Sequence, residues 1–590
     1  MTTSDFERRN TSTVTWALAG IAGALALYIL ATTLYWTSQT FEVIPLLDQW
    51  AIVFLAQFSE QPNFLPHLWE QHNEHRILIP RLISLLDYAW FSGQGYFDLV
   101  CIWLFQIGTA AIVFVLGLRA MAPLSDARAW RAFALAVVIA LFFSVTQIDN
   151  LAFPFQTCFL GQPFFTALAF YCMDRSARID ADRRAFSLWV GGAALASWGS
   201  MLCLASGIFT PLVLIVGGYL VRWPKRVLAA VTVAAAVSIF VYLHGYTQIG
   251  EHGKPLEALA HPGTVLMYIA VYLGSMSTPG DLRGVTISAV IGVGVLAILL
   301  TVIFRLWRTG LLIPAARAPS PAIANIALLG IVAVSGGQAL ITALGRYNLG
   351  IDQAMSGRYY SVRLLIWACL LLMAFGVAAR ARLRREVWIG LAAALSACIV
   401  VALAAEQRTL GKAAKNGGVV RQIGTDSLLT GVIDPPTLSL ARADADVVLG
   451  TMQYLSAKKL SLFASRWYAA LGQPIQSVAT VRPPETCTGW FETASIDGVN
   501  GGAKVEGWGW SVADGRPFDR IVLADTTGRI VGLATTGLPR VDIRMTMPNA
   551  GTDQFGWRGY TRAGDNISAY GIIDGKFACK LPGSWPLNLP

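Results

Sequence analysis

Long apolar runs recur through the first two-thirds of the chain, and they constrain its fold more than any other feature. Most of these runs are about 20 residues long, which is the length that a helix needs to cross the hydrocarbon core of a bilayer. The chain of 590 residues is 55% hydrophobic and only 14% charged, whereas soluble domains carry about 25% charged residues. We therefore predict an α-helical polytopic membrane protein.

Hydropathy and run length together predict about 11 transmembrane helices. They cover residues 14–36, 97–118, 131–148, 156–173, 186–205, 207–222, 226–244, 285–304, 322–343, 361–379 and 386–405. The first run follows Arg8 and Arg9 and is too long for the apolar part of a signal peptide, so we expect a membrane anchor that is not cleaved.

Six groups of arginines at the ends of the predicted helices all fall on one side of the membrane. They cluster at residues 8–9, 128–131, 175–184, 222–226, 305–317 and 380–385. The positive-inside rule places this side in the cytoplasm, and it explains the net charge of +10 without a nucleic-acid partner. An odd number of helices that starts inside places the C-terminal region outside.

One apolar stretch, residues 264–278, would reverse this topology if it crossed the membrane. Counting it as a transmembrane helix would put Arg305, Arg308 and Arg317 outside, against the positive-inside rule. We therefore expect residues 245–284 to form one outer loop that contains an interfacial or re-entrant helix.

The polar region after the last predicted helix has two parts. Residues 1–405 form the predicted membrane domain, 406–485 a mixed linker or subdomain, and 486–590 a run of short alternating strands that predicts a β-sandwich. Cys487 and Cys579 lie close to the ends of the β-rich part, so we predict a disulfide between them in an oxidising compartment.

Aromatic side chains recur along these predicted strands. They could stack on sugar rings, because the CH groups of a sugar pack well on an aromatic face. The candidates are Trp508, Trp557 and Tyr560. The alternative is that the alternating pair Trp508 and Trp510 faces the core of the β-domain.

The first outer loop, residues 37–96, is unusually rich in ionisable side chains. Three of the six histidines, His67, His72 and His75, fall within its segment "HLWEQHNEH". Apolar residues at helical spacing predict an amphipathic helix over 66–90 that lies on the membrane surface, with His72, His75 and Arg76 on one face.

These residue types suit group transfer from an anionic lipid-linked donor. A carboxylate can take a proton from an acceptor hydroxyl, and we predict Asp48 as this base, with Glu74 as the second choice. Basic and polar side chains can hold a phosphate leaving group. The predicted contacts are His72, Asn73, His75, Arg76, Asp149, Arg346, Arg358 and Tyr359. The alternative is that several of these residues only anchor helix ends at the interface, although ionisable groups at membrane depth are functional candidates.

The order of these features resembles the GT-C superfamily of integral-membrane glycosyltransferases. The resemblance rests on one helix followed by a long outer loop that begins with an acid in "LDQW", then many helices and a soluble outer tail. It implies that Asp48 is the general base, that the donor is a polyprenyl-phosphate sugar, and that transfer proceeds with inversion. It further implies a cell-envelope glycan or glycolipid acceptor at the outer face of a bacterial inner membrane. The family often has paired acids, whereas Gln49 follows Asp48 here, so a divalent metal is possible and not required.

Two other functions fit a polytopic protein with a soluble domain. A transporter or flippase of a lipid-linked saccharide would typically show internal repeats and charges near the membrane midplane, and we find neither. A scaffold for envelope enzymes would leave the charged first loop unexplained. The enzyme is therefore the favoured hypothesis.

Overall fold

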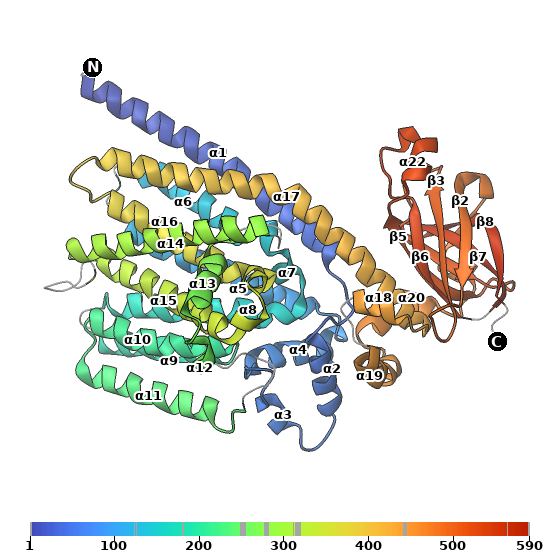
Figure 1. The fold of residues 1–590 in the computed structure, drawn as a ribbon, viewed down its shortest axis with the longest axis horizontal. Coiled ribbons are helices and arrows are strands. Elements are labelled where there is room, and N and C mark those ends of the chain that lie inside the picture. The colour runs from blue at the N-terminus through green and yellow to red at the C-terminus, as the bar shows by residue number, and fades with distance from the viewer. Residues whose placement is uncertain are drawn as a thin grey trace. The chain divides into compact units, whose positions relative to one another are not determined.

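The computed structural model describes residues 3–122, 124, 127–179, 182–247, 255–275, 282–310, 312, 320–440, 445–562 and 564–587. The chain divides into two compact units (Figure 1). The bundle unit comprises residues 1–38, 65–83 and 98–412, and the C-terminal unit comprises 39–64, 84–97 and 413–590. Segments of the first outer loop therefore belong to both units.

Helices make up the bundle unit. Its elements, some of which extend beyond the unit, are α1 (Thr3–Thr40), α3 (Leu65–Trp69), α4 (Leu78–Phe91), α5 (Tyr96–Ala120), α6 (Ala127–Phe142), η1 (Val145–Gln147), α7 (Ile148–Ala152), η2 (Pro154–Gln156), α8 (Thr157–Ser176), α9 (Arg183–Met201), η3 (Ala205–Ile208), α10 (Phe209–Leu220), α11 (Lys225–Leu243), α12 (Pro255–Ala258), α13 (Pro262–Gly274), α14 (Leu282–Arg308), α15 (Ser320–Arg346), η4 (Tyr347–Leu349), η5 (Ile351–Met355), η6 (Gly357–Tyr359), α16 (Tyr360–Ala378) and α17 (Arg385–Thr430). Figure 1 shows α1 and α17 side by side, and the amide oxygen of Gln407 on α17 accepts hydrogen bonds from Thr32 and Thr33 of α1.

Eight helices among the described residues are long and apolar enough to cross a membrane. They are Thr13–Thr40, Tyr96–Ala120, Arg128–Ala152, Lys225–Leu243, Arg283–Arg308, Pro321–Leu349, Gly357–Ala378 and Arg385–Thr430. Each coincides with one predicted span, which confirms the polytopic membrane class. The other three predicted spans coincide with α8 and α9, which are long but less apolar, and with α10, which is apolar but short.

The stretch that challenged the predicted topology forms a short helix, α13. It has 13 residues, and at 1.5 Å per residue it is about 20 Å long, too short to cross a hydrocarbon core of about 30 Å. The expectation of a helix that does not span the membrane by itself agrees with this length.

The predicted amphipathic helix over 66–90 is interrupted. Residues 65–69 form α3 and residues 78–91 form α4, and the segment between them is a turn in which His72 and His75 pair their backbones. Asn73 has φ +48°, a left-handed conformation that Asn tolerates better than most residues. His72, His75 and Arg76 therefore do not share a helix face. This turn and contacts with distant parts of the chain outweigh the apolar periodicity.

The C-terminal unit combines short helices with one eight-stranded sheet. The helices are α2 (Gln49–Phe58), α18 (Pro435–Leu440), α19 (Ala445–Lys458), η7 (Ser461–Ala464), α20 (Arg466–Ala470), α21 (Ile475–Val478), η8 (Pro484–Thr486), α22 (Val541–Thr546) and η9 (Pro548–Ala550). The strands are β1 (Thr480–Arg482), β2 (Cys487–Ser495), β3 (Ala503–Ser511), β4 (Arg520–Ala524), β5 (Ile530–Leu538), β6 (Gly556–Thr561), β7 (Gly564–Ile573) and β8 (Phe577–Leu587). Their order is β1-β8-β7-β4-β5-β6-β3-β2, antiparallel except for β1 beside β8.

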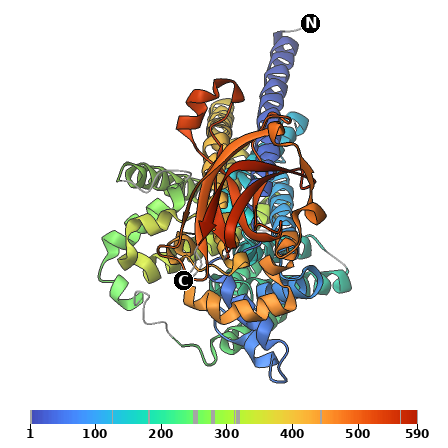
Figure 2. The same ribbon diagram turned by 90° about the vertical axis from the view of Figure 1, so that its right-hand side faces the viewer.

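The strands form a single curled sheet, whereas a sandwich of two sheets was predicted (Figure 2). Gly559 illustrates how closely its strands pack, because a Cβ there would lie 2.1 Å from the carbonyl oxygen of Leu533. One face of the sheet encloses a core around Phe491, Phe518 and Trp557. The other face packs against the short helices through residues such as Val522, Leu533 and Ile572.

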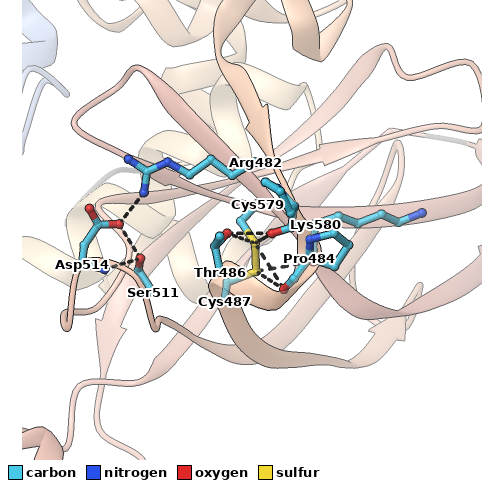
Figure 3. The surroundings of a disulfide bond; sticks show 9 residues. Arg482, Pro484, Thr486, Cys487, Ser511, Asp514, Cys579 and Lys580 are labelled. Atoms are coloured by element: carbon cyan, nitrogen blue, oxygen red, sulfur yellow. Dashed lines mark hydrogen bonds and ion pairs between the residues drawn. A yellow bond between two sulfur atoms is a disulfide. The ribbon is translucent and has the colours of Figure 1, made fainter.

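A disulfide between Cys487 on β2 and Cys579 on β8 joins two strands that lie far apart in the strand order (Figure 3). The two Cα atoms lie 6.3 Å apart, and 92 residues separate the cysteines in the sequence. The predicted disulfide is confirmed. It fastens the curl of the sheet, because β2 is the last strand in the order and β8 the second.

Candidate functional site

A tight turn places a carboxylate and two imidazoles next to each other in the bundle unit. The backbone N–H of His72 donates to the carbonyl of His75 at 2.7 Å, and the N–H of His75 donates back to His72 at 2.9 Å. Asn73 and Glu74 form the tip of this turn. The structure therefore brings together four of the predicted site residues, although not by the predicted helical spacing.

Glu74 connects this turn to the end of α15. Its carboxylate oxygens lie 3.8 Å from Arg346 NH2 and 3.8 Å from His75 Nε2. Glu74 also acts on Tyr246, and burial together with this negative charge raises the pKa of the tyrosine. The carboxylate is 27% exposed, so a molecule in solution can still reach it.

His75 is held as a neutral ring at physiological pH. Burial lowers its pKa to about 4, helped by His72 and Arg346 and opposed by Glu74. Its side chain keeps 24% exposure, yet removal of water from around the ring is the largest cause of the shift. Nδ1 accepts the backbone N–H of Ala205 at 3.4 Å, which leaves the proton on Nε2 facing Glu74. His75 therefore cannot supply the positive charge predicted for it, but it can donate a hydrogen bond.

The positive charges of three arginines act on one hydroxyl in the bundle unit, that of Tyr268 on α13. Electrostatic interactions reach this hydroxyl from Arg346, Arg358 and Arg363. Arg346 is 17% exposed, and Arg358 lies over the ring of Tyr359 with 5.5 Å between its guanidinium carbon and the ring centre. Arg346 thus links the Glu74 turn to a strongly cationic cluster, which we call the arginine site and define as Arg346, Arg358, Arg363, Tyr268 and Tyr272.

Arg363 is almost fully buried, at 1% exposure. Its guanidinium donates to the backbone carbonyls of Ala354, Ser275 and Ser356 and lies over the rings of Tyr360 and Tyr272 at 4.5 and 5.3 Å. Within the described part of the chain it has no carboxylate partner. A buried cation without a counter-charge is costly, so this arginine favours an anionic ligand nearby.

Several polar atoms beside Arg363 have no hydrogen-bond partner among the described residues. They are the hydroxyls of Tyr268, Tyr272 and Ser275 and the Nε of Arg363. Tyr268 and Tyr272 are 0% exposed and Ser275 is 1% exposed. Leaving such groups unpaired costs about 1–3 kcal/mol each, so a set of four indicates a place where a ligand or ordered water completes the bonding.

Asp149 and the segment that carries Arg358 lie against each other. A Cβ on Gly357 would lie 2.7 Å from Asp149 Oδ2, so only glycine allows this approach. The neighbouring Asn150 donates to Ser361 Oγ at 2.8 Å and to the carbonyl of Gly357 at 3.3 Å. These contacts fix η6, and with it the backbone of Arg358, against α7.

Arg76 has a different role from the predicted one. Its guanidinium donates to the carbonyls of Trp69, Tyr242 and His244 at 2.6–2.8 Å, and the residue is 6% exposed. With Nε, Nη1 and Nη2 each donating to a backbone carbonyl, Arg76 fastens the first loop to the end of α11. Sequence alone does not separate such an arginine from a ligand-binding one.

Asp48 lies in the C-terminal unit, immediately before α2. It is exposed and occupies the N-cap position of α2 without a side-chain bond to the helix. Its assignment as the general base stays a prediction.

Two of the three aromatic side chains predicted to stack on sugars are buried in the C-terminal unit. Trp557 is 1% exposed and packs on Phe491, while Tyr560 is 0% exposed and donates to Asp434. Both rings are already covered by protein, so they cannot stack on a sugar in this conformation. Trp508 is half-buried and pairs across the strands with the exposed Trp490.

Among the described residues, no group of three or more His, Cys, Asp or Glu side chains could hold a metal ion.

Comparisons with known proteins give little further information. No protein-family model and no curated protein matches the chain. A search of solved structures finds the crystal structure of ArnT from Cupriavidus metallidurans in the apo state, at 12% identity and a TM-score of 0.30, over 74% of this chain and 89% of that chain. A likeness at this TM-score carries no argument about function, so the proposal below rests on the residues.

Sequence reasoning missed Tyr268, Tyr272 and Arg363. A signal for each was present. The two tyrosines are four residues apart in an apolar segment, which places them on one face of a helix, and Arg363 interrupts an apolar run, which marks a functional candidate in a membrane protein.

Proposed function

We propose that this protein is a membrane glycosyltransferase that uses a polyprenyl-phosphate-linked sugar as donor. The observation that carries the proposal is the arginine site. Three arginines lie near tyrosine hydroxyls that have no hydrogen-bond partner among the described residues, and one of these arginines, Arg346, faces the carboxylate of Glu74.

A lipid phosphate fits this arrangement both through its phosphate group and through its lipid chain. Arginine and hydroxyl donors suit phosphate oxygens, and charge-assisted hydrogen bonds are the stronger kind. The surrounding helices present apolar surface, on which a polyprenyl chain can lie. A water-soluble sugar nucleotide would gain nothing from that surface.

The reaction that follows is a direct displacement at the anomeric carbon. The acceptor hydroxyl gives its proton to a carboxylate, and its oxygen bonds to the anomeric carbon. The bond from that carbon to the phosphate oxygen breaks, with inversion of configuration. The polyprenyl phosphate leaves with the electron pair, and Arg346, Arg358 and Arg363 stabilise the charge that develops on it.

We assign proton abstraction to Asp48 and a supporting role to Glu74. Glu74 already faces Arg346 and His75, which suits a carboxylate that orients a phosphate-binding arginine. Asp48 is exposed, so an acceptor hydroxyl can reach it. Glu74 remains the alternative base.

The acceptor in this proposal is a cell-envelope glycan or glycolipid at the outer face of a bacterial inner membrane. The Cys487–Cys579 disulfide supports an outer location for the C-terminal unit, because disulfides persist in oxidising compartments. The exposed Trp490 and the half-buried Trp508 next to it are the aromatic surface on which a glycan could lie.

Transfer from a panel of radiolabelled polyprenyl-phosphate sugars to crude envelope glycan, in liposomes, tests the proposal. We expect label in the glycan with the wild type, none with Asp48→Asn, and reduced transfer with Glu74→Gln. Full activity of Asp48→Asn together with an inactive Glu74→Gln would exchange the two roles. Binding of the lipid-linked sugar without transfer from any donor would refute the enzyme and favour the flippase.

A further inference from the structure

The segment that carries Asp48 is built into the core of the C-terminal unit. Ile44, Trp50 and Val53 are 0–3% exposed. They share one hydrophobic cluster with residues from the chain after residue 413, among them Leu428, Leu438, Val448, Leu462, Val522 and Leu533. Residues 39–64 therefore fold as part of this unit, although residues 65–412 separate them from its C-terminal part in the sequence.

Polar contacts fasten the same segment along its length. Its backbone carbonyls accept hydrogen bonds from side chains of the later chain, and Glu60 forms an ion pair with it. These contacts are Arg421 to Thr40 at 3.1 Å, Ser461 to Val43 at 2.9 Å, Tyr454 to Ala56 at 3.2 Å and Lys458 to Glu60 at 3.1 Å.

A chain of buried polar groups reaches the segment at Glu42. With its amide oriented to satisfy both neighbours, Gln422 donates to Glu42 Oε2 at 2.6 Å and accepts from Arg520 NH1 at 2.9 Å. Arg520, at 5% exposure, forms an ion pair with the fully buried Asp426. Asp426 also accepts the hydroxyl of Thr535 on β5 at 2.6 Å. Glu42, six residues before Asp48, is thus linked to the sheet through Gln422 and Arg520.

The backbone between Glu42 and Asp48 is strained. Leu47 has φ +47°, a left-handed conformation that costs a residue with a Cβ roughly 1–2 kcal/mol. Such a conformation persists only where surrounding contacts impose it. Leu47 itself is 52% exposed, so contacts of its backbone and of its neighbours impose this conformation. They include the hydrogen bonds of Leu46 and Leu47 with Gln49 and Trp50 and the contacts at Glu42, Val43 and Ile44.

We propose that Gln422 and Arg520 are positioning residues for the general base: they hold Glu42 and thereby fix the loop conformation in which Asp48 is presented. The C-terminal unit then supplies the loop that carries the proposed base. This inference rests on the proposed function for the role of Asp48, while the link between the sheet and the loop stands independently of any activity.

The charge state of Glu42 agrees with a tightly enclosed contact. Burial raises its pKa to about 8, reinforced by Asp426 and opposed by Arg421 and Arg520. At neutral pH the carboxyl group is therefore mostly protonated, which allows it to sit beside Asp426 without repulsion.

Hydrogen–deuterium exchange on the full-length protein in nanodiscs tests the link. Gln422→Met removes the hydrogen-bonded link between Glu42 and Arg520 but keeps the Arg520–Asp426 ion pair. Arg520→Met removes the link and the ion pair. We expect amides 41–48 to exchange about tenfold faster in Gln422→Met, which corresponds to about 1.4 kcal/mol, while strands β4 and β5 remain protected. Arg516→Met is the matched control, because Arg516 lies four residues earlier, is 39% exposed and pairs only with exposed acids among the described residues. Unchanged exchange at 41–48 in both variants overturns the proposal.

Transfer kinetics then separate positioning from general damage. We expect kcat to fall about tenfold in Gln422→Met while KM for the polyprenyl-phosphate donor stays within about twofold, and we expect Arg520→Lys to recover part of the kcat lost in Arg520→Met. Faster exchange at 41–48 with unchanged kcat would refute the positioning role but keep the link. If no donor supports transfer even in the wild type, the proposed function fails, and the exchange result still decides the link.

Discussion

Arg363 in the bundle unit and Arg520 in the C-terminal unit are both almost fully buried, at 1% and 5% exposure, but their surroundings differ. Arg520 is paired with the buried carboxylate of Asp426. Arg363 contacts backbone carbonyls and tyrosine rings, with no carboxylate among its partners in the described chain.

The difference separates a structural charge from a functional one. A buried ion pair is complete within the protein, so removing one partner damages the fold. A buried cation that lacks a counter-ion leaves positive potential in the site, which an anionic ligand can use. By this comparison Arg520 belongs to the architecture, and Arg363 is the arginine that we propose for ligand binding.

The largest expected effect is on the structural arginine. Asp426→Asn leaves Arg520 buried without a counter-charge, and we expect the C-terminal unit to lose about 3–5 kcal/mol of unfolding free energy. Hydrogen exchange of β4 and β5 in the full-length protein measures this loss. Asp519→Asn, which removes an exposed partner of Arg516, should change stability by less than about 1 kcal/mol. Equal losses in the two variants would show that burial does not distinguish the two pairs.

Loss of the disulfide should rank next and should affect only the C-terminal unit. The bond closes a loop with a sequence separation of 92 residues, so replacing Cys487 and Cys579 by alanine is expected to cost about 2–4 kcal/mol. Thermal unfolding with and without reductant measures the effect. Cys398→Ala, which removes an exposed free cysteine of the bundle unit, serves as the control, and a comparable loss there would contradict the prediction.

Arg363→Met should weaken ligand binding more than it weakens the fold. Removing this donor is expected to raise the Kd for a polyprenyl phosphate about tenfold or more, since a hydrogen bond to a charged group contributes about 1.5–3 kcal/mol. Arg363→Lys should retain part of the affinity, because it keeps the charge. The reverse pattern, with normal binding and a destabilised bundle, would assign Arg363 to the architecture together with Arg520.

The last prediction concerns the pH dependence of stability, through Glu42 in the loop that carries Asp48. The pKa of Glu42 rises from its ordinary value of 4.5 to about 8 in the folded protein, so unfolding releases a proton between these values. Stability should therefore fall as pH rises through this window. Glu42→Gln removes the titration and should flatten the profile by on the order of 1 kcal/mol per pH unit, as measured by denaturant unfolding from pH 5 to pH 8. An unchanged slope would show that Glu42 is not enclosed in solution.

Periodicity predicted the membrane helices well and the first loop poorly. Apolar runs of membrane length can fold in few ways, because every backbone group in lipid must be bonded within the helix. Over residues 70–77 the apolar spacing predicted a helix, but Asn73 adopts a left-handed turn and Arg76 bonds to the carbonyls of α11. Local pattern could not reveal these partners, which come from residues far along the chain.

The same limit applies to the aromatic residues of the β-domain. Alternation along β6 was visible in the sequence, but the face that each ring would take was not. Trp557 and Tyr560 are both buried, one in the core enclosed by the sheet and one against Asp434, because the curled sheet is covered on both faces there.

The sequence by itself determined the membrane class, the helical spans, the β-rich C-terminal region and its disulfide, since each depends on composition or on a pattern that repeats locally. Only the tertiary structure decided which charges serve the fold and which are left to bind a ligand. It gathered Arg346, Arg358, Arg363, Tyr268 and Tyr272, and it placed Asp48 within the C-terminal unit. The physical reason is that the role of a charge is set by the partners that burial gives it, and those partners become neighbours only when the chain folds.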